Sequence, residues 1–273
     1  MSISSGGTQM PDKSVFALMR DSGKPETGLE PESRLVESPV FIMSLMRSGS
    51  TLLRCVLDTH PLIHSPHELH LSGLGVRFEK GELTRLSARK LGLKLADLKY
   101  LLWDSLLHRQ LRQSGKRIIV EKTPANIFIH EELACCWPLA RYIFLRRHPA
   151  DMVKSLVTTG ICDSKDAAVN LVIEWAEQLD AALDATDRSV VVRYEDLTNE
   201  PEKTCRQLTA FLDVPFDSRM LEYGNVNHGA LDAGVGDWGE NIHSGRIKKV
   251  TEYRRERPAE GVIEICERWG YTW

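Results

Sequence analysis

Apolar residues occur along this chain in short continuous runs. The clearest are PVFIMSL (39–45), KRIIVEKTP (116–124), ARYIFLRR (140–147) and SVVVRYEDL (189–197). Their length and their content of Val and Ile are typical of strands. A strand that is apolar at consecutive positions is covered on both faces, so the pattern predicts a buried sheet.

Segments with apolar residues three or four positions apart separate these runs and predict helices. They cover 51–59, two patterns within 81–115, and then 126–137, 150–159, 166–185, 200–214 and 259–271. Pro149 fits the first turn of one helix, and Gly115 fits the end of another. Because strands and helices alternate, we expect an α/β fold with a central, mostly parallel sheet flanked by helices on both faces.

Two segments depart from the alternation. Residues 1–37 are rich in Ser, Gly, Pro and charge, which predicts a flexible N-terminal arm before a single domain at 38–273. Residues 217–257 are polar and contain glycine, which predicts mostly loop.

Composition narrows the class of protein. The chain has 273 residues, a formal net charge of −3 and 42% hydrophobic residues, so it lacks the basic excess of a nucleic-acid binder. It has no N-terminal apolar signal and no apolar run that could span a membrane, so we expect a cytoplasmic protein. The six cysteines form no CxxC pair and no ligand spacing with His, which predicts reduced thiols and no metal site.

Ligands of a parallel sheet bind at the carboxyl ends of its strands. The first such loop is MRSGST (46–51), in which Gly49 permits a tight turn before the start of a helix. Arg47 adds a planar cation. Hydroxyl donors come from Ser48, Ser50 and Thr51. The frame GxxxxGK[ST] is absent, which disfavours a nucleoside triphosphate with Mg²⁺. Alone, the loop is equally well explained as a capped turn with a surface arginine.

The later loops add further candidates. Lys122 leaves a buried strand beside a turn, where an ammonium is costly unless it reaches solvent or an anion. Arg147 follows a strand and Ser155 lies eight residues later, so both can reach one phosphate, although Arg147 could equally be a solvated charge. Tyr194 begins YEDL, for which capping and packing of the next helix is the simpler interpretation.

Taken together, the order strand–RSGST–helix, KTP, strand–R-x7-S and RYEDL resembles that of the sulfotransferases that use 3′-phosphoadenosine 5′-phosphosulfate (PAPS). It is most similar to the bacterial and tyrosylprotein-type branch, whose first loop reads PRSGTT; Met46 and Ser50 replace Pro and Thr here. The resemblance covers about residues 38–215. It implies a P-loop-kinase-like sulfotransferase fold, transfer of a sulfuryl group from PAPS to a hydroxyl, PAP as product, and no required metal.

The resemblance also implies residue roles. The loop that binds the 5′-phosphosulfate would consist of Arg47, Ser48, Gly49, Ser50 and Thr51. Lys122 would lie near the sulfate, and Arg147 and Ser155 would bind the 3′-phosphate. Tyr194 would contact the nucleotide. Members of the tyrosylprotein-type branch carry a second arginine where this chain has Thr159; Arg246, in a late loop that resembles a cofactor-closing segment, is a candidate to compensate.

Sulfuryl transfer needs stabilisation of the leaving phosphate, which Arg47 and Lys122 would supply, and a base for the acceptor hydroxyl. Glu68 lies 21 residues after Arg47, as a glutamate does in the tyrosylprotein-type branch. His67 and His70 are alternatives, because another branch uses histidine.

The acceptor is expected to be a small-molecule or natural-product alcohol. The segments LHLSGLGVRF (69–78) and LKYLLWDSLLH (98–108) offer an apolar wall for it, although such positions are more often core. Homodimers are common in the family, but no motif here bears on them. Two other functions stay open: an NTP-dependent small-molecule kinase of related topology, and a non-catalytic nucleotide-binding protein.

Overall fold

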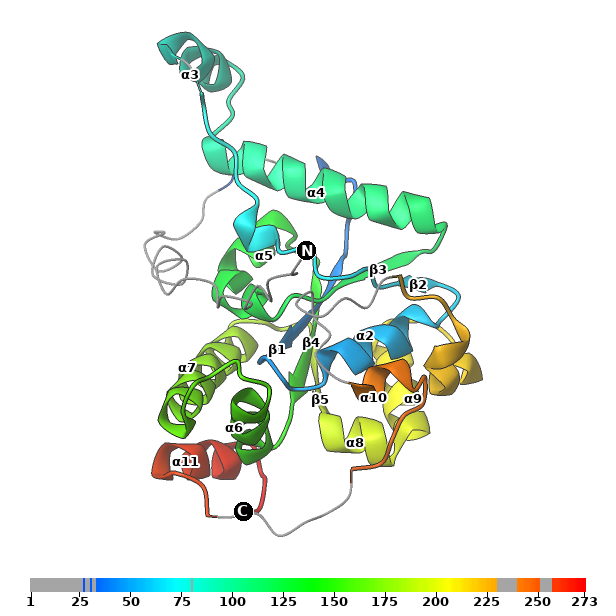
Figure 1. Cartoon of the computed structure of the whole chain (residues 1–273). Helices are drawn as coiled ribbons and strands as arrows, with labels where there is room; N and C mark the ends of the chain where they lie inside the picture. The colour runs from blue at the N-terminus through cyan, green and yellow to red at the C-terminus, as the bar shows by residue number, and fades with distance from the viewer. Residues whose placement is uncertain (1–26, 28–29, 31–32, 80, 230–239, 251–256) are drawn as a thin grey trace, which may run out of the picture.

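The computed structural model describes residues 27, 30, 33–79, 81–229, 240–250 and 257–273. Within them, five strands form one sheet in the order β2-β3-β1-β4-β5 (Figure 1). The strands are β1 (Val40–Ser44), β2 (Ile63–His64), β3 (Ile118–Glu121), β4 (Arg141–Arg146) and β5 (Ser189–Arg193). Each neighbouring pair runs parallel, which confirms the fold class expected from the sequence.

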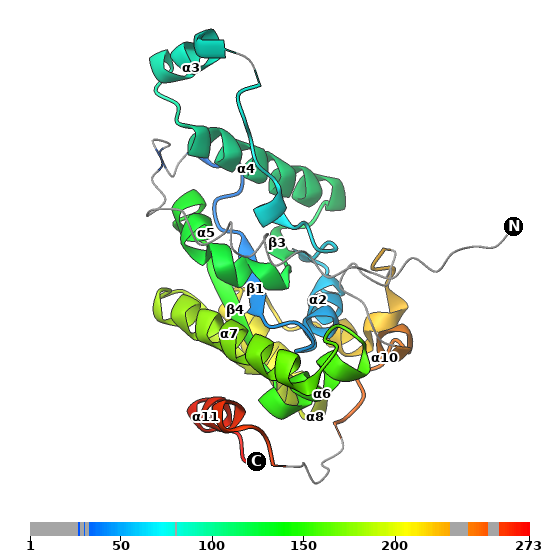
Figure 2. The same cartoon turned by 60° about the vertical axis from the view of Figure 1, so that its left-hand side comes forward.

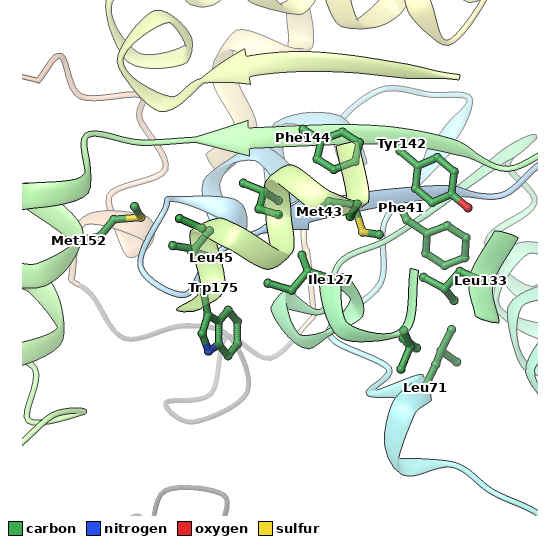
Figure 3. Packing of buried hydrophobic residues seen from close by; sticks show 14 of the residues in the cluster. Phe41, Met43, Leu45, Leu71, Ile127, Leu133, Tyr142, Phe144, Met152 and Trp175 are labelled. Carbon is green, nitrogen blue, oxygen red and sulfur yellow. The ribbon is translucent and has the colours of Figure 1, made fainter. Parts of the chain in front are cut away.

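The central strand β1 is buried on both faces. Its residues Phe41 and Met43 pack in one hydrophobic cluster, while Val40 and Ile42 pack in another on the opposite face. Figure 3 shows Phe41 and Met43 beside side chains of β4 and facing the helical layer. This two-sided burial is the physical reason that the strands appear in the sequence as uninterrupted apolar runs.

Helices cover both faces of the sheet (Figure 1). One face packs against η3 (Pro124–Ile129), α4 (Leu95–Ser114), α5 (His130–Cys136), α6 (Pro149–Thr158), α7 (Lys165–Asp184) and α11 (Glu260–Arg268). The other packs against α2 (Ser50–Asp58), α8 (Tyr194–Asn199), α9 (Pro201–Phe211), η4 (Ser218–Asn225) and α10 (Glu240–His243). The loops after β1 and β3 therefore lead to opposite faces, an arrangement at which α/β sheets bind ligands.

Several local predictions were wrong in detail. The run 189–197 is strand only as far as Arg193, and α8 begins at Tyr194. The Glu195 carboxylate accepts a hydrogen bond from the His148 backbone N–H at 3.0 Å and one from the Tyr271 hydroxyl at 2.8 Å. These long-range contacts hold the start of α8, and no local pattern encodes them. The segment 126–137, expected as one helix, divides into η3 and α5.

Short elements were also missed. The edge strand β2 has two residues, too few for any periodic signal. The segment expected as loop, 217–257, contains η4 and α10.

The predicted arm, residues 1–37, lies mostly outside the described residues. Its last residues contact the domain: the Arg34 side chain donates to the Cys136 carbonyl, and the Asp104 carboxylate accepts from the Leu35 and Val36 backbone N–H groups. Among the described residues, no helix is long and apolar enough to cross a bilayer.

The region between β2 and α4 includes η2 (Leu71–Gly73) and α3 (Gly81–Lys90). In both views α3 stands away from the sheet and its covering helices (Figures 1 and 2). Its Leu83 is 78% exposed, so α3 contributes little to the core.

A buried carboxylate fixes the C-terminal end of α2. Asp58 accepts a hydrogen bond from the Ser65 backbone N–H at 2.9 Å, and its other oxygen lies 2.8 Å from Nδ1 of His228. His64 and Lys116 lie 3.4 and 3.5 Å from the first oxygen. Burial alone would raise the pKa of Asp58, but these hydrogen bonds and the Lys116 charge hold it well below its usual range.

We predict that Asp58 makes stability depend on pH in the acid range. The folded carboxylate resists protonation, whereas the same group in the unfolded chain takes up a proton near pH 4. The stabilisation is therefore complete above about pH 5 and is lost as the pH falls further. Urea unfolding between pH 6 and pH 3 should show a steeper loss in the wild type than in Asp58→Asn, by up to about 1.4 kcal/mol per pH unit. The exposed Asp187→Asn is the control and should keep the wild-type slope. Equal slopes in wild type and Asp58→Asn would contradict this role.

Candidate active site

The loop after β1 presents the beginning of α2 to the carboxyl edge of the sheet. Gly49 is the N-cap of α2, with φ of 88°. As a glycine it has no side chain that could cap the first N–H groups of the helix. The first turn also carries no acidic residue. Because the first N–H groups of a helix have no intrahelical partner, this end of α2 favours an anion.

Arg47 joins this loop to α6. Its Nε donates to the Ser155 hydroxyl at 3.0 Å. Its backbone has φ of 65°, a left-handed conformation that few residues other than glycine adopt. The Arg147 guanidinium donates to the Arg47 carbonyl oxygen at 2.7 Å and holds this conformation from the loop after β4.

Tyr194 covers the same loop from the end of β5. The Arg147 guanidinium carbon lies 4.7 Å from the centre of its ring, a cation–π distance. The ring lies so close to Gly49 that a Cβ there would be 2.2 Å from a ring carbon. The Nε of Arg147 is buried and has no hydrogen-bond partner among the described residues. The structure thus brings together Arg47, Gly49, Arg147, Ser155 and Tyr194, each predicted from the sequence.

A buried ion pair lies after β3. The Lys122 ammonium is 1% exposed and pairs with the Glu68 carboxylate, which is 8% exposed. The second carboxylate oxygen of Glu68 lies 3.2 Å from Nε2 of His70, whose side chain is 56% exposed. The structure therefore places Glu68 next to both Lys122 and His70.

Glu121, the last residue of β3, was missed by the sequence reasoning. Its carboxylate accepts hydrogen bonds from the Leu69 backbone N–H at 3.0 Å, from the Thr123 hydroxyl at 2.6 Å and from the Asn126 side-chain amide. Burial raises the pKa of Glu121 above its usual range, although these hydrogen bonds oppose the effect. The signal that could have revealed it is a carboxylate that ends an otherwise apolar strand.

Other predicted residues lie apart from these contacts or serve the backbone. The Ser48 hydroxyl donates to the Leu45 carbonyl at 2.6 Å, and Ser50 is buried at the start of α2. Thr51 follows it, partly buried. His67 is exposed. Arg246 is exposed, and its carbonyl oxygen accepts a hydrogen bond from the Tyr223 hydroxyl at 3.4 Å.

Comparison with known proteins identifies the family. Residues 39–218, well over half of the chain, match the profile of the sulfotransferase family. The chain belongs to this family.

Among curated relatives of this sulfotransferase, protein-tyrosine sulfotransferase 1 of Danio rerio is 25% identical over 200 residues, 67% of this chain and 55% of the relative. Protein-tyrosine sulfotransferase A of Caenorhabditis elegans is 25% identical over 203 residues, 67% and 52% of the two chains. This chain thus spans about half the length of these two relatives.

Solved structures show the same fold. The sulfotransferase domain of the Synechococcus PCC 7002 olefin synthase matches with a TM-score of 0.63 and 24% identity, over 93% of this chain and 100% of the other. The sulfotransferase domain of the curacin biosynthetic pathway also matches with a TM-score of 0.63, at 22% identity, over 88% and 99% of the two chains. The sulfotransferase fold expected from the motifs is confirmed.

We predict that the contact between Gly49 and Tyr194 makes glycine obligatory in the sulfotransferase loop. Gly49→Ala adds a clash with the ring to the strain of a positive φ. Gly115→Ala, at φ of 66° with nothing within 4 Å of its Cβ, adds the strain alone. Urea unfolding should show that Gly49→Ala costs at least about 2 kcal/mol more than Gly115→Ala. Adding Tyr194→Ala should restore part of the difference, and equal costs for the two glycine substitutions would refute the contact.

Proposed function

We propose that this sulfotransferase is an enzyme that transfers a sulfuryl group from PAPS to the hydroxyl of a small-molecule acceptor. Family membership supports the reaction class. The observation that carries the cofactor assignment is the contact of Arg147 with Arg47 and Tyr194, beside the start of α2. That arrangement collects cationic and N–H donors where the loops after β1, β4 and β5 meet.

The residues present fit a nucleotide with several anionic groups. The first turn of α2 offers backbone N–H groups, and the buried Nε of Arg147 is an unused donor among the described residues. A buried donor without a partner is costly, so it favours an anionic acceptor. When bound, PAPS would supply the sulfuryl group and a phosphate leaving group. Arg147 and Ser155 would hold the 3′-phosphate, and Tyr194 would lie beside the nucleotide.

Two cations would act on the charge that develops during transfer. Arg47 offers a planar guanidinium with further N–H donors besides the Nε bonded to Ser155. Lys122 carries a buried ammonium, and burial strengthens its interaction with an anion because the local dielectric is low. Fixed cations of this kind stabilise a leaving phosphate without reorganisation.

Glu68 is the proposed base for the acceptor hydroxyl. One of its oxygens pairs with Lys122, and the other lies near Nε2 of His70. Because His70 is more than half exposed, it offers a path for the proton from Glu68 to solvent. This geometry favours Glu68, assisted by His70, over His67.

The expected acceptor wall is partly wrong. Tyr100, Trp103 and Leu107 of α4 are at most 1% exposed and pack in the core against the sheet. They are buried because the inner face of α4 covers the sheet, so they do not line a pocket for an alcohol. The small-molecule acceptor therefore stays a prediction. A screen of hydroxylated small molecules and tyrosine peptides with PAPS, read by mass spectrometry for sulfuryl addition, tests this prediction. Addition to a peptide but to none of the small molecules would overturn it.

We predict that the protein binds PAP and not ADP with Mg²⁺ in isothermal titration. Arg147→Ala should weaken PAP binding about tenfold or more, because a charge-assisted hydrogen bond is lost. The same variant should lose less affinity for adenosine 5′-phosphate, which lacks the 3′-phosphate, because only the support of the Arg47 backbone is then lost. Equal losses with both nucleotides would assign Arg147 to loop structure alone. Preference for ADP with Mg²⁺ would favour a kinase, and PAP binding without turnover of any acceptor would favour a non-catalytic protein.

We predict that Glu68→Gln and Arg47→Ala each abolish most transfer while the fold persists. Loss of a general base costs about 10²–10⁴-fold in kcat, and loss of a charge-stabilising donor about 10²–10³-fold. Initial rates of PAP release and far-UV circular dichroism measure the two effects. The matched control is Glu132→Gln, which removes a carboxylate of α5 that is paired with Lys99 of α4. Turnover by Glu68→Gln close to that of the control would assign the base to His70 or His67.

A further inference from the structure

We propose that Glu121 is a positioning residue that fixes the backbone of the segment carrying the base. The inference rests on the proposed function, because Glu68 matters to catalysis only if it is the base. The positioning itself can be tested without measuring enzymatic activity.

Two backbone hydrogen bonds join the segment 68–70 to the end of β3. The Leu69 N–H donates to the Glu121 carboxylate at 3.0 Å. The His70 N–H donates to the Thr123 hydroxyl oxygen at 3.2 Å, and that hydroxyl donates to the same Glu121 oxygen at 2.6 Å. The two peptide groups that follow Glu68 are therefore held by one carboxylate, directly and through Thr123.

The conformation of His70 shows that the segment needs such support. Its φ is 48°, in the left-handed region that is unfavourable for a residue with a side chain. A conformation of this kind persists only where its surroundings fix it. The ion pair of Glu68 with Lys122 attracts the side chain but leaves the backbone free to rotate. The hydrogen bonds to Thr123 and Glu121 supply the missing constraint.

The hydrogen bonds at this position need an acceptor that an apolar side chain cannot supply. Three donors converge on Glu121, from Leu69, Thr123 and Asn126. An ionised carboxylate only accepts, so it can satisfy all of them. A leucine would accept from none of them and would leave the Leu69 N–H and the Thr123 hydroxyl unpaired in a fully buried place.

Hydrogen exchange of the Leu69 and His70 amides tests the positioning. Glu121→Leu and Thr123→Val should each lower protection of these amides at least about tenfold, because the segment then opens more often. Thr123→Ser keeps the hydroxyl, so this variant should keep the wild-type protection of both amides. Asp104→Asn is the matched control, since Asp104 is also buried and accepts from Leu35, Val36 and Trp137, far along the chain from the base. It should lower the melting temperature but leave exchange at 69 and 70 unchanged.

Kinetics with an acceptor from the screen give the second readout. In Glu121→Leu and Thr123→Val, kcat should fall about 10- to 100-fold, the cost of misplacing a catalytic group. KM for PAPS and the Kd for PAP should stay within about threefold, because the cofactor loop is intact. Wild-type exchange in both folded variants, or an equal kcat loss in Asp104→Asn, would overturn the proposal. If Glu121→Leu does not fold, Thr123→Val decides.

The two proposals fail in different ways. A wild-type protein that neither binds PAP nor transfers a sulfuryl group would refute the proposed function, while the exchange results would still decide whether Glu121 holds the segment. Normal exchange in the variants beside normal PAPS turnover would refute the positioning and leave the function standing.

Discussion

The arrangement of the site depends on the hydrogen bond from the Arg147 guanidinium to the Arg47 carbonyl. This bond ties the loop after β1 to the loop after β4, and the same guanidinium lies over Tyr194 at the end of β5. Three loops that are distant in sequence are thereby held by one cation. Arg47 can keep its left-handed backbone, and with it the hydrogen bond to Ser155, because that cation fixes the carbonyl.

Helix α2 is held at both ends, which fixes the direction of its N–H groups. Tyr194 packs on Gly49 at the beginning, and Asp58 binds Ser65 and His228 at the end. The beginning of α2 lies at the carboxyl edge of the sheet and its end at the opposite edge. A helix anchored so can present its first turn to an anion without having to become ordered when the anion binds, which lowers the entropic cost of binding.

The second half of the site follows a different physical rule. Lys122 and Glu68 are both buried, and burial of either charge alone would be costly. Their pairing makes the burial tolerable and brings the segment after β2 against the end of β3. Glu121 accepts a hydrogen bond from the Leu69 N–H of that segment and another from the Thr123 hydroxyl. A buried charge pair and a buried carboxylate therefore hold a short irregular loop in place together.

The sequence by itself determined the parallel α/β fold, because strands buried on both faces leave continuous apolar runs. The resemblance of its motif order to that of the sulfotransferases indicated Arg47, Gly49, Lys122, Arg147 and Ser155 as one site, which agrees with the meeting of parallel strand ends at one edge of a sheet. Only the tertiary structure decided that Glu68 pairs with Lys122, that α8 begins at Tyr194, and that Tyr100 and Trp103 belong to the core. Glu121 became visible only there too. These features depend on contacts between residues tens of positions apart, and local patterns of polarity carry no record of which distant partner a side chain meets.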